Sequence, residues 1–216
     1  IALIVVFIAI SQTFVQSGLG TALIQKKEVT DEDYSSVFYL TLVVALVFYG
    51  ILFLAAPFIA AFYNQPLITP VLRVLGLTLF FGAINTIQNA VIARNFQFRK
   101  LFISSLGAVL LSGVIGITMA YAGYGVWALV GQQLTSIIAL CAIMWLTVKW
   151  RPKLLFSLTR VKELFSFGWK LLVSGLMDVI YNNLSSLIIG KLYPASMLGY
   201  YTKGQEFPNV LVSNIN

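Results

Sequence analysis

The chain has 216 residues, of which 59% are hydrophobic and 10% charged, with a formal net charge of +7. Soluble domains are about 45–50% apolar and about 25% charged, so this composition excludes an ordinary soluble domain. With no His and one Cys, His-based catalysis, His metal ligation and an internal disulfide are excluded, and we expect neither a cofactor nor a metal ion.

Apolar stretches long enough to cross a bilayer recur along the chain. About 20 helical residues cross a hydrocarbon core of about 30 Å, and charge-free runs cover 1–25, 34–72, 74–93 and 101–148. Asn64-Gln65-Pro66 and the Gly123-Tyr124-Gly125 turn divide the longer runs. The sequence therefore predicts an all-α polytopic transmembrane helix bundle. Its expected spans lie near 1–24, 35–62, 70–93, 101–121, 126–148 and 169–190, and a seventh helix begins around 200.

The two ends of the sequence suggest a piece of a longer protein. Ile1 lies inside an apolar run, and Asn216 follows soon after the seventh helix is expected to begin. The run from Ile1 to Ile10 lacks the charged region that opens a signal peptide, so we interpret it as part of a span.

Basic residues alternate between successive loops. The first, third and fifth loops contain most of the Lys and Arg residues, whereas the second and fourth contain none. By the positive-inside rule, the basic loops are expected to be cytoplasmic. Because these cations lie between apolar spans and not on a soluble face, no nucleic-acid partner is expected. The Lys and Arg residues of these three loops are Lys26, Lys27, Arg94, Arg99, Lys100, Lys149, Arg151, Lys153, Arg160, Lys162 and Lys170.

The fifth loop, 149–168, is longer than the other connections and mixes apolar side chains with its cations. This pattern is typical of a basic amphipathic helix lying among lipid headgroups. An anchoring loop that only fixes topology explains it equally well. In both interpretations this segment is the natural place to divide the chain into two bundles.

Two expected spans have residues that recur every four positions. On the fourth span small residues recur every four positions from Ser104 to Ala120, which predicts close helix packing.

On the sixth span polar residues recur every four positions, and Asp178 among them lies about 12 Å along the helix from Lys170. An acid at that depth is costly unless it is paired, hydrated or protonated, which indicates a functional residue. The alternative is a hydrogen bond between helices. The polar residues are Ser174, Asp178, Asn182 and Ser186.

Polar residues mark other spans as well. Asn85, Gln88 and Asn89 share one face of the third span by their spacing, and Arg73 lies near its outer end. Polar stripes on four helices predict a common water-accessible cavity. The remaining residues of these stripes are Gln12 and Gln16 on the first span and Gln132, Gln133 and Ser136 on the fifth.

The acidic run Asp31-Glu32-Asp33 has two interpretations. It superficially resembles the acidic metal site of a sugar-nucleotide transferase. However, Thr30 and Asp33 have the spacing of a capping box at the start of the second span. We therefore prefer capping.

Five strings along the chain are more specific than its composition: SGLGTALIQ (17–25), NAVIARNFQF (89–98), GYGVWALV (123–130), YNNLSSLIIGK (181–191) and LGYYTK (198–203). They resemble the bacterial polysaccharide transporter family, which includes O-antigen and teichuronic-acid flippases, within the superfamily that also contains multidrug antiporters.

This resemblance implies a fragment of a two-lobe transporter. Residues 1–148 would be the N-terminal lobe without its first helix, 149–168 the basic amphipathic cytoplasmic linker, and 169–216 the start of the C-terminal lobe. The implied function is a flippase of the bacterial cytoplasmic membrane that moves polyprenyl-pyrophosphate-linked oligosaccharide by alternating access. Its partners would be the lipid bilayer, that substrate and polysaccharide assembly proteins.

A polar cavity would shield the headgroup of such a substrate, and a cation in it would offset phosphate charge. The candidate cations are Arg73, Lys191 and Lys203, and the candidate hydrogen-bonding residues are Asn85, Gln88, Asn89, Asp178 and Asn182.

Two alternatives remain open. An ion-coupled multidrug antiporter of the same fold would use Asp178 as its coupling acid. A membrane-bound glycan polymerase or ligase would need a sizeable outer loop with convergent acids or bases, and the outer loops here are short and nearly uncharged. We therefore expect a transporter and not an enzyme.

Overall fold

The computed structural model of the chain describes residues 2–16, 18–194 and 196–205, which form helices and connections, with no strand among them. The helices are α1 (Ala2–Gln16), α2 (Leu19–Gln25), α3 (Asp31–Phe62), α4 (Ile68–Leu75), α5 (Thr78–Arg94), α6 (Phe98–Tyr121), α7 (Val126–Thr147) and α8 (Leu158–Leu192). Residues 196–205 form a further helical segment. The predicted all-α bundle is confirmed. Ile1, Ser17, Ala195 and the last part of the predicted C-terminal lobe, 206–216, lie outside the described residues.

Five stretches of the described chain are long and apolar enough to cross a membrane: α3, the α4–α5 pair, α6, α7 and α8. The α1–α2 pair makes a sixth if its two bent halves count as one span. This agrees with the predicted number of spans, because length and hydropathy determine which helices can lie in the hydrocarbon core of a bilayer.

The first predicted span, 1–24, is broken. α1 and α2 meet at an angle of 40°, and Gly18 between them has a φ of 65°, which favours glycine. A Cβ atom at Gly18 would overlap the carbonyl oxygen of Gly168 and lie 2.8 Å from Cβ of Leu171, both on α8. The predicted span 1–24 therefore consists of two helices with a bend between them, and the bend lies where α8 approaches the chain.

Gly18→Ala is expected to lower the stability of the full-length protein. The left-handed backbone alone costs a non-glycine residue about 1–2 kcal/mol, and the overlap with α8 adds to this. Gly50→Ala in α3 is the matched control, since Gly50 is helical and no atom lies within 4 Å of its added Cβ. Thermal unfolding in detergent should show a lower midpoint for Gly18→Ala only. A midpoint at or above that of the wild type would contradict the described break.

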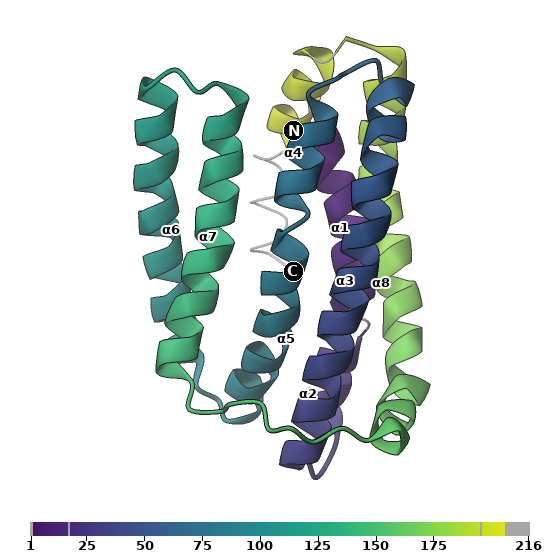
Figure 1. Cartoon of the computed structure of the whole chain (residues 1–216), viewed down its shortest axis with the longest axis vertical. Helices are drawn as coiled ribbons and strands as arrows, with labels where there is room; N and C mark the ends of the chain where they lie inside the picture. Colours follow the sequence, from purple (N-terminus) through teal and green to yellow (C-terminus); the bar gives the residue numbers. More distant parts are fainter. Residues whose placement is uncertain (1, 17, 195, 206–216) are drawn as a thin grey trace.

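α6 and α7 form an antiparallel hairpin at one side of the bundle (Figure 1). Ser104, Ala108, Ser112 and Gly116 on α6 are buried, and a Cβ atom on Gly116 would approach the side chain of Gln132 on α7 to 3.0 Å. The predicted close packing along this row of small residues is thus confirmed, although its last member, Ala120, is exposed.

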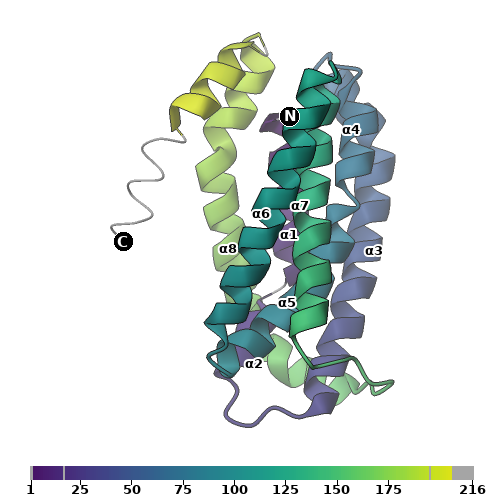
Figure 2. The same cartoon turned by 90° about the vertical axis from the view of Figure 1, so that its left-hand side faces the viewer.

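The remaining helices share two clusters of buried apolar side chains. One cluster includes Leu72, Leu75 and Leu79 of the α4–α5 pair, and the other includes Leu23 of α2 and Ile87 of α5. Figure 2 shows α6 and α7 in front of α1 and α5, with α8 and α3 at the two sides. The outer faces of α3 and α6 expose large apolar side chains, as expected of helices that face hydrocarbon.

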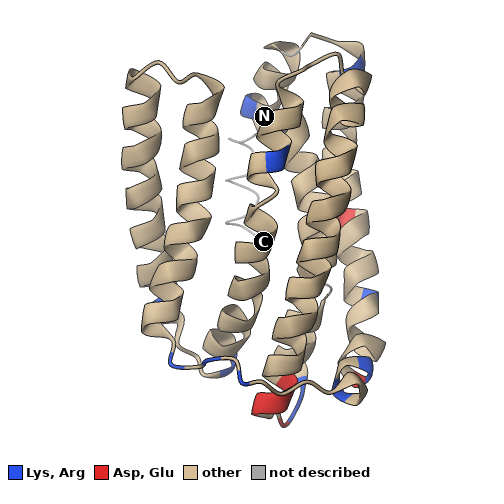
Figure 3. Cartoon of the chain, viewed as in Figure 1, with Lys and Arg blue, Asp and Glu red and all other residues tan. Residues whose placement is uncertain are grey.

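Most of the cations gather at one end of the bundle, where the α2–α3, α5–α6 and α7–α8 connections lie (Figure 3). The predicted capping box is present there: the Thr30 side chain accepts from the backbone N–H of Asp33, and the Asp33 carboxylate accepts from the backbone N–H of Thr30. Lys26 donates to Asp33 and to Glu163 of α8, both at 3.1 Å. These contacts join the start of α3 to the start of α8 at this end, which we call the basic end.

The segment predicted as a linker, 149–168, has two parts. Residues 149–157 are not helical, and their backbone is held against α3: the N–H groups of Lys153 and Ser157 donate to the hydroxyls of Ser35 and Ser36 at 3.0 and 2.9 Å. From Leu158 onward the chain is helical and continues without a break into the sixth predicted span as α8. The division of the chain into two lobes stays a prediction.

Candidate functional site

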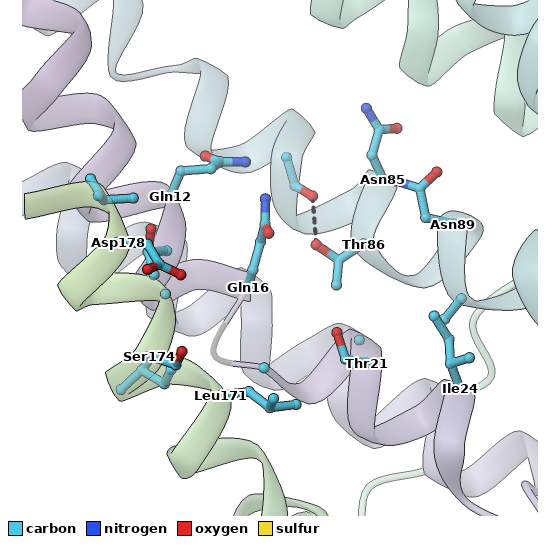
Figure 4. A pocket seen from close by; sticks show the side chains of 18 of the residues that line it. Gln12, Gln16, Thr21, Ile24, Asn85, Thr86, Asn89, Leu171, Ser174 and Asp178 are labelled. Carbon is cyan, nitrogen blue, oxygen red and sulfur yellow. Dashed lines mark hydrogen bonds between the residues drawn. The ribbon is translucent and has the colours of Figure 1, made fainter. Parts of the chain in front are cut away.

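A cavity of about 720 Å³ lies between α1, α2, α5 and α8, nearer the basic end of the bundle. Figure 4 shows labelled side chains that line it from these helices. We call it the first cavity. Its polar lining consists of Gln12, Thr13, Gln16, Thr21, Asn85, Thr86, Asn89, Ser174 and Asp178.

Helical periodicity explains why these residues meet. Gln12 and Gln16 on α1, Asn85 and Asn89 on α5, and Ser174 and Asp178 on α8 are each four residues apart, so each pair projects from one face. Close approach of α5 to α1 also matters: a Cβ atom at Gly82 would overlap the Gln12 side-chain amide. The missing side chain at Gly82 therefore leaves the room in which the Gln12 carboxamide lies.

The first cavity contains polar groups without hydrogen-bond partners. Gln12 Oε1 and Asn85 Oδ1 are buried and have no partner among the described residues. Asp178 is exposed to the cavity, and no cation in the described part of the chain forms an ion pair with it. By contrast, the Thr86 hydroxyl donates to the Gly82 carbonyl at 2.9 Å. Carboxamides both donate and accept hydrogen bonds, so the cavity suits a ligand rich in hydroxyl groups.

A second cavity, of about 830 Å³, lies between the α6–α7 hairpin, α1, α8 and the 196–205 segment. Among the described residues that line it are one cation, Lys203, and no carboxylate. The described lining of the first cavity has the opposite balance of charge, with Asp178 and no cation. The polar residues of the second cavity are Ser112, Gln132, Gln133, Ser136, Asn183, Ser186, Thr202 and Lys203.

The structure thus divides the single cavity expected from the sequence. Gln132, Gln133 and Ser136 of α7 line the second cavity. Gln12 and Gln16 of α1, with Asn85 and Asn89 of α5, line the first. The stripe on α8 is shared between them, because residues four apart advance by about 40° around a helix that has 3.6 residues per turn. Ser174 and Asp178 reach the first cavity and Ser186 reaches the second.

The predicted site residues fall into three groups. Asn85, Asn89 and Asp178 line the first cavity, and Lys203 lines the second. Gln88 is fully buried outside both cavities, with neither amide atom hydrogen-bonded, and Asn182 is exposed outside both. Arg73 and Lys191 also lie outside both cavities.

Arg73 and Lys191 are instead bound to α3. The Arg73 side chain donates to the Phe53 carbonyl at 3.3 Å, and its guanidinium lies 4.0 Å from the centroid of the Phe53 ring. Lys191 donates to the Phe62 carbonyl at 2.6 Å and lies 3.9 Å from the centroid of that ring. Both cations therefore have a structural explanation in cation–π and carbonyl contacts.

Thr21 and Thr86 are cavity residues that the sequence did not single out. Thr21 follows the break at Gly18, so the direction of its side chain depends on this bend. The apolar pattern of 1–24 does not reveal the bend. Thr86 follows Asn85 in sequence, and its hydroxyl bonds to its own helix, which is common for Thr in membrane helices.

The apolar helices and the polar cavities between them define a multi-pass helical membrane protein. A family model described as "Polysaccharide biosynthesis protein" matches residues 1–216. The chain therefore belongs to this family of polysaccharide biosynthesis proteins, as the resemblance of its strings implied.

Three curated relatives are similar to the chain along most of its length. "Teichuronic acid biosynthesis protein TuaB" of Bacillus subtilis (strain 168) is 25% identical over 209 residues, which cover 95% of this chain and 43% of that protein. "Succinoglycan biosynthesis transport protein ExoT" of Rhizobium meliloti (strain 1021) is 25% identical over 210 residues, covering 94% and 42%. "Lipopolysaccharide biosynthesis protein WzxC" of Escherichia coli (strain K12) is 24% identical over 202 residues, covering 91% and 40%.

The chain spans less than half the length of these curated relatives. No solved structure matches it.

Proposed function

We propose that the whole protein is a flippase that moves a polyprenyl-pyrophosphate-linked oligosaccharide across the cytoplasmic membrane by alternating access. The observation that carries this proposal is the first cavity, a carboxamide-rich space between helices that are otherwise apolar. The names of three relatives mention polysaccharide biosynthesis products, and one of them names a transport protein. In this role the protein is a transporter and not an enzyme, and it works beside polysaccharide assembly proteins.

The two cavities suit different parts of such a substrate. Sugar hydroxyls both donate and accept hydrogen bonds, as do the side-chain amides of Gln12, Asn85 and Asn89 in the first cavity. A phosphate group requires a cation, and Lys203 in the second cavity supplies one. The polyprenyl tail would stay in the lipid outside the bundle.

The orientation in the membrane follows from the loop charges. The connections at the basic end contain Lys and Arg, whereas the α3–α4 and α6–α7 connections contain neither. The positive-inside rule then places the basic end in the cytoplasm. The first cavity would lie nearer the cytoplasmic surface.

The second candidate function is an ion-coupled drug antiporter. Asp178 in a cavity without a cation favours it, because such a carboxylate attracts protons or cationic drugs. Complementation separates the two functions. The full-length gene should restore surface polysaccharide to a flippase-null strain and give no drug resistance. Drug resistance without polysaccharide would instead identify the antiporter.

Lys191 in the last turn of α8 and Lys203 in the 196–205 segment give a matched pair for the same assay. Lys203→Ala should reduce export by about tenfold, the effect of losing a hydrogen bond to a charged group. Lys191→Ala should leave export near the wild-type level, since Lys191 contacts Phe62 and lines neither cavity. Surface polysaccharide is compared at equal protein abundance. If both variants export normally, phosphate is not bound through Lys203.

A further inference from the structure

Three helices end with the same backbone motif. At the end of α5, the N–H of Phe96 donates to the Ala93 carbonyl at 3.3 Å, and the N–H of Gln97 donates to the Ile92 carbonyl at 2.9 Å. The ends of α3 and α6 repeat this pair of bonds one for one. This is the Schellman motif, whose central residue has a positive φ. The central residues are Asn64 with a φ of 52°, Phe96 with 52° and Gly123 with 81°.

Phe96 is the unusual member of this set. Glycine and asparagine adopt a positive φ readily, whereas a bulky aromatic residue there is strained. Burial of the side chain does not offset this strain, because 82% of Phe96 is exposed. Its ring contact is with Phe98, edge-on, with centroids 6.2 Å apart. Packing inside the described chain therefore gives no reason for a phenylalanine at this position, which points to a contact outside it.

The surroundings of Phe96 indicate what covers it. Phe98 is exposed at the start of α6, and Phe102 is exposed one turn later on the same side. That side continues along α6 through Leu106 and Leu110, which are also exposed. The rings of Phe96 and Phe98 thus lie at the end of an exposed apolar face of α6 that lipid tails can cover along its length.

The charges beside these rings are free to bind an anion. Arg99 and Lys100 follow Phe98 directly, and neither forms an ion pair with any described residue. Two other cations at the basic end are matched by acids: Lys26 pairs with Asp33, and Lys153 pairs with Asp31 at 2.5 Å. The α5–α6 turn therefore combines exposed aromatic rings with uncompensated positive charge.

We propose that this turn, residues 95–100, is a binding surface for acidic phospholipid headgroups. Phe96 and Phe98 insert at the boundary between headgroups and acyl chains, and Arg99 and Lys100 bind the lipid phosphates. Basic residues beside an apolar insertion are the combination that attaches peripheral segments to anionic leaflets. The inference requires only that the helices span a membrane, and it is independent of the substrate that the protein carries.

Hydrogen exchange of the full-length protein in nanodiscs tests this surface directly, since it reports on the turn itself. Amides of 95–100 should exchange about fivefold more slowly in discs that contain phosphatidylglycerol than in discs of phosphatidylcholine alone, as expected from the attraction of a basic residue to an anionic leaflet. Arg99→Gln with Lys100→Gln should abolish this difference. The matching turn around Asn64, in the α3–α4 connection that contains no Lys or Arg, should exchange equally in both lipids.

Phe96→Gly separates the lipid contact from the fold. It relieves the strained φ, so the helix end should be at least as stable in detergent, yet protection of the turn by lipid should fall. Asn64→Gly is the control and should leave the lipid effect unchanged. Equal exchange in both lipids would overturn the proposal. So would full protection in detergent without lipid, because another part of the protein would then cover the rings.

Discussion

Asp33→Ala is expected to lower the stability of the full-length protein by about 3 kcal/mol, more than a typical surface substitution. The Asp33 side chain is fully buried and has two roles. It closes the capping box with Thr30, and it accepts from Lys26 at 3.1 Å with Arg160 of α8 at 3.9 Å. Its removal leaves the backbone N–H of Thr30 without its acceptor, which opens half of the capping box, and leaves a mostly buried ammonium with one partner fewer.

Asp31→Ala is the matched control, two residues away. Asp31 also forms an ion pair, with Lys153, but both side chains are about half exposed, and such surface pairs contribute about 0–1 kcal/mol. Asp33→Asn should fall between the two, since an amide oxygen can still accept from Thr30. Unfolding midpoints in detergent should therefore decrease in the order Asp31→Ala, Asp33→Asn, Asp33→Ala. If Asp33→Ala is as stable as Asp31→Ala, the described network does not hold α3 and α8 together.

Asp178→Ala is expected to reduce export of surface polysaccharide by about tenfold or more, because it removes the one carboxylate among the described residues that line the first cavity. Asn182→Ala, one turn along α8, should export at the wild-type level, since Asn182 lies outside both cavities. Both residues belong to the same series of polar residues on α8. The comparison therefore tests whether lining the first cavity matters for export, and not merely membership of that series. Protein abundance in the membrane is measured alongside. Equal export by both variants would contradict a role for the first cavity.

Features set by local sequence were predicted well. The spans follow from apolar length, and the capping box follows from the spacing of Thr30 and Asp33. The packing of α6 against α7 follows from small residues every four positions. Each of these depends on residues within one helix or at its end, where side-chain size and hydropathy decide the outcome.

Features set by contacts between distant segments were not predicted. The break at Gly18 depends on Gly168, which is 150 residues away. Gln88 shares a helical face with Asn85 on a helical wheel, but neighbouring helices bury it outside both cavities. The charge of Arg73 predicted a phosphate-binding residue, whereas its contact with Phe53 of α3 is a tertiary feature that the sequence does not reveal. Polar type and spacing therefore identify candidate residues, and packing decides which of them reach a cavity.

Transport in proteoliposomes tests the proposed flippase activity most directly. The full-length protein is reconstituted into vesicles that contain a polyprenyl-pyrophosphate-linked oligosaccharide, and a glycosidase added outside reports which sugars have reached the outer leaflet. We predict that sugars initially protected inside become accessible with the wild-type protein and stay protected with Asp178→Ala. If the wild-type protein leaves the protected fraction equal to that of protein-free vesicles, the proposed function is contradicted.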